Sequence, residues 1–123
     1  NRRFHTAFHM GNILMTVGAA SGLNVILKTL LDPGDQVLTF APYFVEYGNY
    51  VRNYDGILEV VLPDTDTFQP NLEELSRRIT ERTKAVIINT PNNPTGVIYS
   101  AETLTRLGSI LEEKEKPLEP RSC

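Results

Sequence analysis

Tryptophan is absent from the sequence, cysteine occurs once, and no apolar run approaches the ~18 residues of a membrane-spanning helix. The single cysteine, Cys123, is the last residue and cannot form an internal disulfide, so we expect a reducing, cytoplasmic location. No charged-then-apolar pattern of a signal peptide opens the chain, and we expect no membrane partner. The chain also lacks an excess of positive charge, since its net charge is −3. This argues against a nucleic-acid partner.

The length and composition are those of a globular protein. The 123 residues correspond to about one domain, and 41% of them are hydrophobic and 22% charged. The first residue is Asn, and residues 1–10 have the pattern of a helix that is already under way. We therefore expect that the sequence is cut at its front.

Short apolar runs alternate with helical patterns along the chain. The predicted strands are 12–17, 36–42, 57–63 and 84–91, and the predicted helices that follow them are 23–31, 44–54, 72–79 and 100–111. Asn71 and Ser100 are expected to cap the last two helices. Four successive strand–helix units favour parallel strands with helices on both faces. The predicted fold class is therefore α/β, a three-layer α/β/α arrangement with a largely parallel sheet.

The predicted domain occupies residues 1–111. Residues 112–123 are charged, contain two prolines and lack an apolar stripe. We expect this tail to be disordered or non-native sequence.

Three strand-to-helix loops are expected to meet at one edge of the sheet, where open α/β sheets bind ligands. In the first loop, Gly18, Ala19 and Ala20 leave backbone N–H groups of a helix start free for an anion, although a tight turn alone would explain these small residues. In the second, Phe44 could stack on a flat ligand ring or pack with Tyr47 in the core. Both interpretations stay open for these two loops.

The third loop contains "NNPTG", residues 92–96, directly after an apolar strand. An X–Pro bond in a turn is one of the few places where a cis peptide occurs, and it would hold the Asn93 amide across the strand ends. A rigid turn without a ligand is the alternative. N-glycosylation is excluded because Pro94 occupies the middle position of Asn-Pro-Thr.

Two histidines, His5 and His9, are four residues apart and could share a metal ion. No third ligand accompanies them, so a solvated helix face is the favoured interpretation and no metal site is predicted. A Ser–His–Asp or Cys–His catalytic set cannot be assembled from the sequence either.

Taken together, these loops resemble the large domain of class I and II aminotransferases, the fold type I enzymes that use pyridoxal 5′-phosphate. The resemblance covers about residues 1–111 and rests on "NILMTVGAASGLN", "LLDPGDQVLTFAPYFVEY", "TFQPNLEEL" and "TKAVIINTPNNPTGVIYS". It implies a partial large domain of this fold, with pyridoxal 5′-phosphate as the cofactor.

The resemblance also implies which residues would face the cofactor. Residues 18–20 match the loop whose backbone holds the phosphate, although many members carry a hydrogen-bonding side chain at position 20. Phe44 matches the aromatic that stacks on the pyridine ring, and Asn93 matches the asparagine that hydrogen-bonds the 3′-oxygen. Pro42 and Pro94 match positions where the family often has cis prolines.

The family's Schiff-base lysine has no counterpart in this sequence. In the family it lies well downstream of the Asn-Pro-Thr-Gly turn, whereas only 27 residues follow Gly96 here. The aspartate at the pyridine nitrogen and the arginines that bind phosphate and substrate are absent too, and none of the lysines at 28, 84, 114 and 116 matches. No catalytic residue is therefore predicted. The chain is expected to be a truncated fragment, inactive alone, with weak or undetectable cofactor binding.

The intact family transfers an amino group between an amino acid and a 2-oxo acid, usually as a homodimer. Two other functions stay open. A non-catalytic truncated paralogue could pair with a full-length subunit through the exposed edge of an incomplete sheet. A nucleotide-binding α/β module would require a fuller glycine fingerprint and an acidic residue after the second strand, where this chain has "FAP".

Overall fold

A computed structural model describes residues 6–115. Its sheet has three strands, β1 (Gln36–Phe40), β2 (Ile57–Val61) and β3 (Thr83–Ile87), in the order β2-β1-β3. Both pairs are parallel. The helices are α1 (Gly18–Leu30), α2 (Glu46–Arg52), α3 (Leu72–Arg78) and α4 (Ala101–Lys114), with a short 3₁₀ helix, η1 (Met10–Asn12), before them. The predicted α/β class with a parallel sheet is confirmed.

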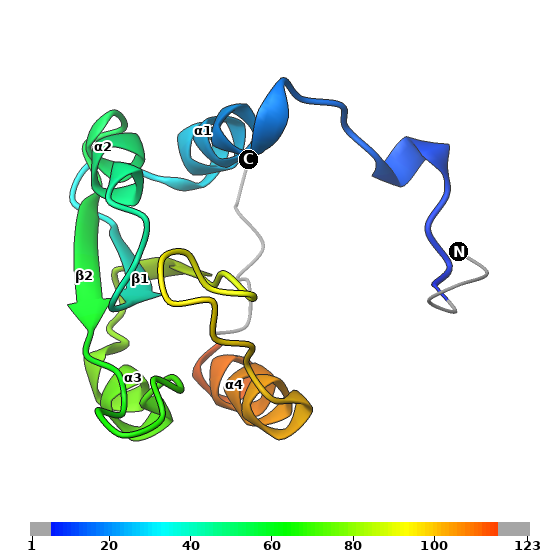
Figure 1. Ribbon diagram of the computed structural model, residues 1–123. Helices are drawn as coiled ribbons and strands as arrows, with labels where there is room; N and C mark the ends of the chain where they lie inside the picture. The colour runs from blue at the N-terminus through cyan, green and yellow to red at the C-terminus, as the bar shows by residue number, and fades with distance from the viewer. Residues whose placement is uncertain (1–5, 116–123) are drawn as a thin grey trace.

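Helices cover the sheet on both faces, α1 and α2 on one and α3 and α4 on the other (Figure 1). Neighbouring residues of β1 point to opposite faces: Val37 packs in the cluster under α1 and α2, whereas Leu38 packs in the cluster under α3 and α4. Both are fully buried, and each such side chain contributes about 1.5–3 kcal/mol relative to an exposed one. The apolar residues at neighbouring positions of β1, Val37 and Leu38, follow from this burial on two sides.

The two predicted helix caps are confirmed. Asn71 Oδ1 accepts the Glu74 N–H at 3.0 Å, and Ser100 Oγ accepts the Thr103 N–H at 3.0 Å. Each bond satisfies one backbone donor that the first helical turn leaves without a partner, which is worth about 1 kcal/mol.

The predicted strand at 12–17 is wrong. Asn12 ends η1, which begins where His9 Nδ1 accepts the Gly11 N–H at 3.1 Å. Residues 13–17 then run away from the sheet without pairing (Figure 1), and Met15 and Val17 are 87% and 92% exposed. The apolar pattern was that of a strand, but a strand also needs a neighbour, and none lies against this segment among residues 6–115.

The chain ends differ from the predictions in two further respects. Residues 6–9, expected at the end of a helix, are not helical, and residues 1–5 lie outside the described part. Helix α4 continues to Lys114, so residues 112–114 of the predicted tail are helical, whereas 116–123 lie outside the described part.

A charge network ties α3 to β2. Arg78 Nε lies 2.8 Å from Glu74 Oε1, and its Nη1 lies 3.5 Å from Glu59 Oε2. The hydrogen bond from Arg78 is the main reason why the pKa of Glu74 lies below its ordinary value, and the charge of Arg77 adds to the effect. The stability that Glu74 contributes is therefore present above its unfolded-state pKa and is lost as the pH falls through the lowered one.

We expect Arg78→Gln to raise the pKa of Glu74 towards its ordinary value, because the main stabilising partner of the carboxylate is removed. Arg77→Gln is the matched control, since Arg77 lies 3.2 Å from the same carboxylate but is 71% exposed and contributes less. A ¹³C NMR titration of the Glu74 carboxyl measures both shifts. A larger shift in Arg77→Gln would contradict this assignment.

Candidate cofactor site

The loops that carry Phe44 and Asn93 lie together at the carboxyl edge of the sheet. Phe44 follows β1, Asn93 follows β3, and these two parallel strands are neighbours. A side-chain bond joins the loops directly, because Asn92 Nδ2 donates to Pro42 O at 3.0 Å. Two of the three predicted contact points are thus held close together.

The third contact point, residues 18–20, lies at the start of α1. Its link to the other two is indirect: Leu23, early in α1, and Tyr43, next to Phe44, pack against the same buried cluster around Leu27 and Tyr47. Helix α1 also lies beside α2, where Asn24 Oδ1 accepts a hydrogen bond of 3.2 Å from Tyr54 Oη.

The first turn of α1 has no side-chain cap, although the Gly18 N–H already donates to Thr16 O at 3.0 Å. The N-cap residue, Val17, provides no side-chain cap, and the first turn contains no acidic residue. Gly18 has a φ of +78°, which L side chains rarely adopt, and no atom lies within 4 Å of where its Cβ would be. The N–H groups of Ala19 and Ala20, together with the positive end of the helix dipole, favour a phosphate at this position.

The two aromatic residues of the loop after β1, Phe44 and Tyr47, differ in burial. Tyr47 is 8% exposed and belongs to the core, and burial, followed by the charge of Tyr50, raises its pKa. Phe44 is 39% exposed and lies edge-to-face against Tyr47, with ring centroids 5.9 Å apart. The buried tyrosine therefore packs against a ring that is itself partly exposed, so the stacking role of Phe44 stays a prediction.

The turn after β3 is held by its own asparagines. Asn89 Oδ1 accepts the Asn93 N–H at 2.8 Å, while the Asn93 side chain is exposed. Asn92 is 9% exposed and faces inward. The peptides before Pro42 and Pro94 are cis, as predicted, and the peptide before Pro91 is cis as well. The sequence pointed to Asn93 and not to Asn92, because the motif alone does not show which of two adjacent asparagines is buried.

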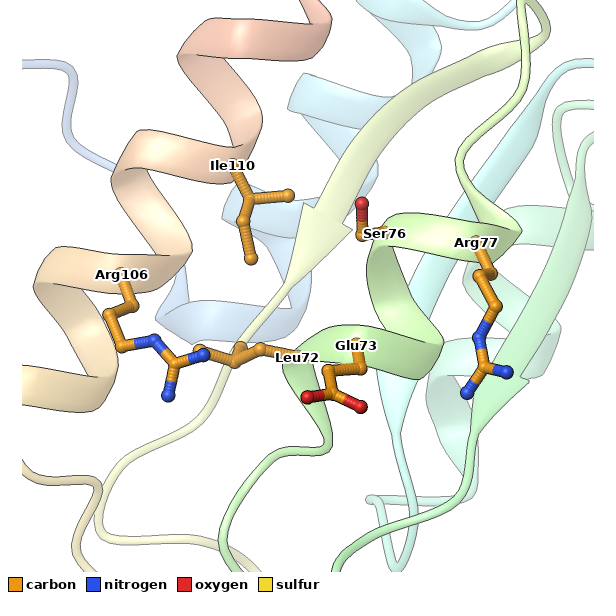
Figure 2. Close-up of a pocket in the computed structure, with 6 residues that line it drawn as sticks. All are labelled: Leu72, Glu73, Ser76, Arg77, Arg106 and Ile110. Atoms are coloured by element: carbon orange, nitrogen blue, oxygen red, sulfur yellow. The ribbon is translucent and has the colours of Figure 1, made fainter.

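A hollow lies between α3 and α4, and none of the three loops lines it (Figure 2). It has a volume of about 490 Å³ and is lined by Leu72, Glu73, Ser76, Arg77, Arg106 and Ile110. The hollow is open to solvent, and its lining includes both acidic and basic side chains. None of the predicted site residues is among them.

Residues 6–115 offer neither a metal site nor a helix that could cross a membrane. No group of three His, Cys, Asp or Glu side chains there could hold a metal ion. His9 caps η1 and is not on a helix face, whereas His5 lies outside the described residues. Over the same residues, no helix combines the length and apolar character needed to cross a membrane.

Comparison with known proteins identifies the family. The sequence model described as "Aminotransferase class I and II" matches residues 2–118. The chain belongs to this aminotransferase family. The probable aspartate/prephenate aminotransferase of Aquifex aeolicus is 41% identical over 103 residues, which are 83% of this chain and 26% of that protein. The Thermus thermophilus aspartate/prephenate aminotransferase is 40% identical over 103 residues, 83% of this chain and 27% of the relative.

The solved structures agree with the aminotransferase assignment. An amino transferase from Eubacterium rectale is 42% identical and superimposes with a TM-score of 0.91, over 93% of this chain and 29% of that one. The sheet and helices are therefore part of a fold type I large domain, and the chain spans about a quarter of the length of the curated relatives that it matches.

The residues of this aminotransferase-family chain suit pyridoxal 5′-phosphate. The uncapped start of α1 without acidic residues suits the phosphate, half-exposed Phe44 suits the ring, and the exposed amide of Asn93 can donate to an oxygen at the ring edge. Phe44 and Asn93 are positioned by one edge of the sheet, and the start of α1 is linked to them through the cluster around Leu27 and Tyr47.

Proposed function

We propose that this chain supplies the phosphate, ring and 3′-oxygen contacts of an aminotransferase cofactor site, and that it has no transaminase activity alone. The observation that carries the proposal is the bond from Asn92 to Pro42 O, which joins the Phe44 and Asn93 loops at the carboxyl edge of the sheet. Pyridoxal 5′-phosphate, when bound, supplies an electron sink for amino-acid chemistry.

In this proposal each contact belongs to a named group. The backbone N–H groups of Ala19 and Ala20 donate to the phosphate, in a helix start whose dipole favours negative charge. Gly18, whose own N–H donates to Thr16 O, leaves space beside them because it has no side chain. The face of Phe44 lies against the pyridine ring and excludes water from it. Asn93 Nδ2 donates to the 3′-oxygen and fixes the rotation of the ring. These groups bind and orient the cofactor, and none of them transfers a proton.

The described lysines do not belong to the loops that carry the proposed contacts. Lys28 is ten residues along α1 from Gly18, about 15 Å at the rise of an α-helix. Lys84 is near the start of β3, at the end of the strand opposite to Asn93. Lys114 ends α4, about 20 Å from the start of that helix. For a complete family member we propose amino-acid and 2-oxo-acid substrates, a cytoplasmic location and a homodimer. We do not propose them for this chain alone.

A titration with pyridoxal 5′-phosphate tests the proposal. We expect weak, reversible shifts of the ¹H–¹⁵N NMR signals of residues 18–20 and of the Asn93 side-chain amide. After borohydride reduction, mass spectrometry is expected to find no specifically labelled lysine. Asn93→Ala should weaken binding about 5- to 10-fold, the effect of one net hydrogen bond.

Two controls define the result. Pyridoxine has the ring but no phosphate, so it should leave the signals of residues 18–20 unmoved. Asn53→Ala changes an exposed asparagine after α2 and should leave binding unchanged. Covalent labelling of one particular lysine, or signal shifts confined to other surfaces, would refute the proposal.

One observation favours a second role, pairing with a longer aminotransferase chain. The apolar side chains of residues 13–17 are largely exposed, and β3 has only β1 as a neighbour among the described strands. Both features leave surface that another polypeptide could cover. Co-expression with a full-length relative, followed by size-exclusion chromatography, tests this role; two separate peaks would exclude it.

A further inference from the structure

Asn92 is one of few polar side chains buried in the described part of the molecule, and it is 9% exposed. Its Nδ2 donates two hydrogen bonds, to Pro42 O at 3.0 Å and to Thr95 Oγ1 at 2.9 Å. Its backbone N–H donates to Val97 O at 2.8 Å, and its carbonyl accepts the Gly96 N–H at 2.7 Å. Both amide hydrogens and both backbone groups thus have partners, as burial requires.

The two side-chain hydrogen bonds of Asn92 differ in the sequence separation of their partners. Thr95 belongs to the same turn, so that bond is local. Pro42 is fifty residues away in sequence, in the loop after β1, so that bond crosses from one loop to the other. Within the strands, a side-chain hydrogen bond from Thr39 Oγ1 in β1 to Ile87 O in β3, 3.1 Å long, also connects this pair. Beyond the strand ends, Asn92 continues this connection into the loops.

The crossing bond lies between the two predicted cofactor contacts. Pro42 is two residues before Phe44, and Asn92 is the residue before Asn93. The Asn93 N–H is fixed within its own turn by Asn89, but that bond does not set the position of the turn relative to Phe44. The bond from Asn92 to Pro42 O does.

We propose that Asn92 is a positioning residue of the cofactor site, whose buried amide sets the spacing between the Phe44 ring and the Asn93 side chain. This inference rests on the function proposed above, because it concerns the same site. Asn92 itself faces away from the ligand and acts through these two neighbours. A cofactor that must meet an aromatic face and an amide at once binds well only while their spacing is held.

Two substitutions separate the crossing bond from the local one. Asn92→Ala removes both bonds, whereas Thr95→Val removes the local partner and leaves the bond to Pro42 O in place. All proteins are compared at a temperature at which circular dichroism shows them fully folded, so that a general loss of stability does not enter the comparison. The affinity for pyridoxal 5′-phosphate and the ¹H–¹⁵N signals of residues 43–45 are then measured by NMR.

We expect Asn92→Ala to bind pyridoxal 5′-phosphate about tenfold more weakly and to shift the signals of residues 43–45, since the loops lose one fixed contact. Thr95→Val should bind within about twofold of the unchanged chain and leave those signals in place. Should Asn92→Ala not fold, Asn92→Asp serves instead: Asp keeps the size and can accept from the Thr95 hydroxyl, but cannot donate to Pro42 O. Its readout is the signals of residues 43–45, because its charge alone would alter affinity.

The outcomes distinguish this inference from the proposed function. If the unchanged chain binds and Asn92→Ala binds equally well, or if Thr95→Val weakens binding as much, Asn92 is not the positioning residue and the proposed function stands. Unmoved signals of residues 43–45 in Asn92→Asp would overturn the inference in the same way. If the unchanged chain does not bind pyridoxal 5′-phosphate at all, both the proposed function and this role are wrong.

Discussion

Replacing Leu38 by alanine is expected to destabilise the folded chain by about 2–5 kcal/mol. Leu38 is fully buried in the middle of the central strand and packs with Leu75 and Leu107 beneath α3 and α4. Its truncation removes apolar contacts and leaves a cavity that the paired strands on either side cannot close. Because whole domains are stable by about 5–15 kcal/mol, this one change is expected to remove a large share of the total.

Urea denaturation followed by circular dichroism measures the effect. Leu14→Ala is the matched control, since the same side chain is 76% exposed there and its removal should cost less than about 0.5 kcal/mol. Similar losses in both variants would mean that the Leu38 side of the sheet is not a packed core.

A methyl group at Gly56 is expected to destabilise the chain by about 1–3 kcal/mol. A Cβ there would lie 2.8 Å from Leu31 Cδ1 and 2.9 Å from Val51 Cγ1, and 3.2 Å from the backbone oxygen of Val51. Leu31 and Val51 are both buried in the cluster under α1 and α2, so neither can move aside without disturbing its neighbours.

Gly108→Ala is the control, because it is expected to change the free energy of unfolding in the opposite direction. Gly108 lies within α4, and no atom lies within 4 Å of where its Cβ would be. Alanine is the better helix former by about 0.5–1 kcal/mol, so this variant should gain stability. Thermal unfolding of the two variants should move the midpoint in opposite directions; a fall in both would show that α4 does not tolerate the change for a reason other than space.

Three of the four predicted strands and the α/β class could be derived from the sequence, because periodicity reports burial on one or two faces. The strand at 12–17 could not, since an apolar run does not specify its neighbour. The strands β1 and β3 end earlier than predicted, at Phe40 and Ile87. The prolines that follow them belong to the turns, where a residue without an N–H loses nothing.

The candidate site, too, could be predicted from the sequence only in part. The loops and the residues within them were predicted from motif and order, and the assignment of residues 18–20, Phe44 and Asn93 to a cofactor stays a prediction. The role of Asn92 could not be derived, because its partner, Pro42 O, is a backbone atom fifty residues away. No side-chain pattern identifies a backbone acceptor, and only the folded arrangement brings it into reach.

The strand order β2-β1-β3 also affects how the chain can fold. In the pair of β1 with β2, Gln36 lies opposite Ile57, 21 residues later, whereas in the pair of β1 with β3, Val37 lies opposite Ala85, 48 residues later. Closing the longer loop costs about 0.7 kcal/mol more chain entropy. We therefore expect β1, α2 and β2 to form a β-α-β nucleus early, and β3 to dock later. The turn that carries Asn92 and Asn93 would then be among the last parts of the chain to reach its place, and the first to leave it when the chain unfolds.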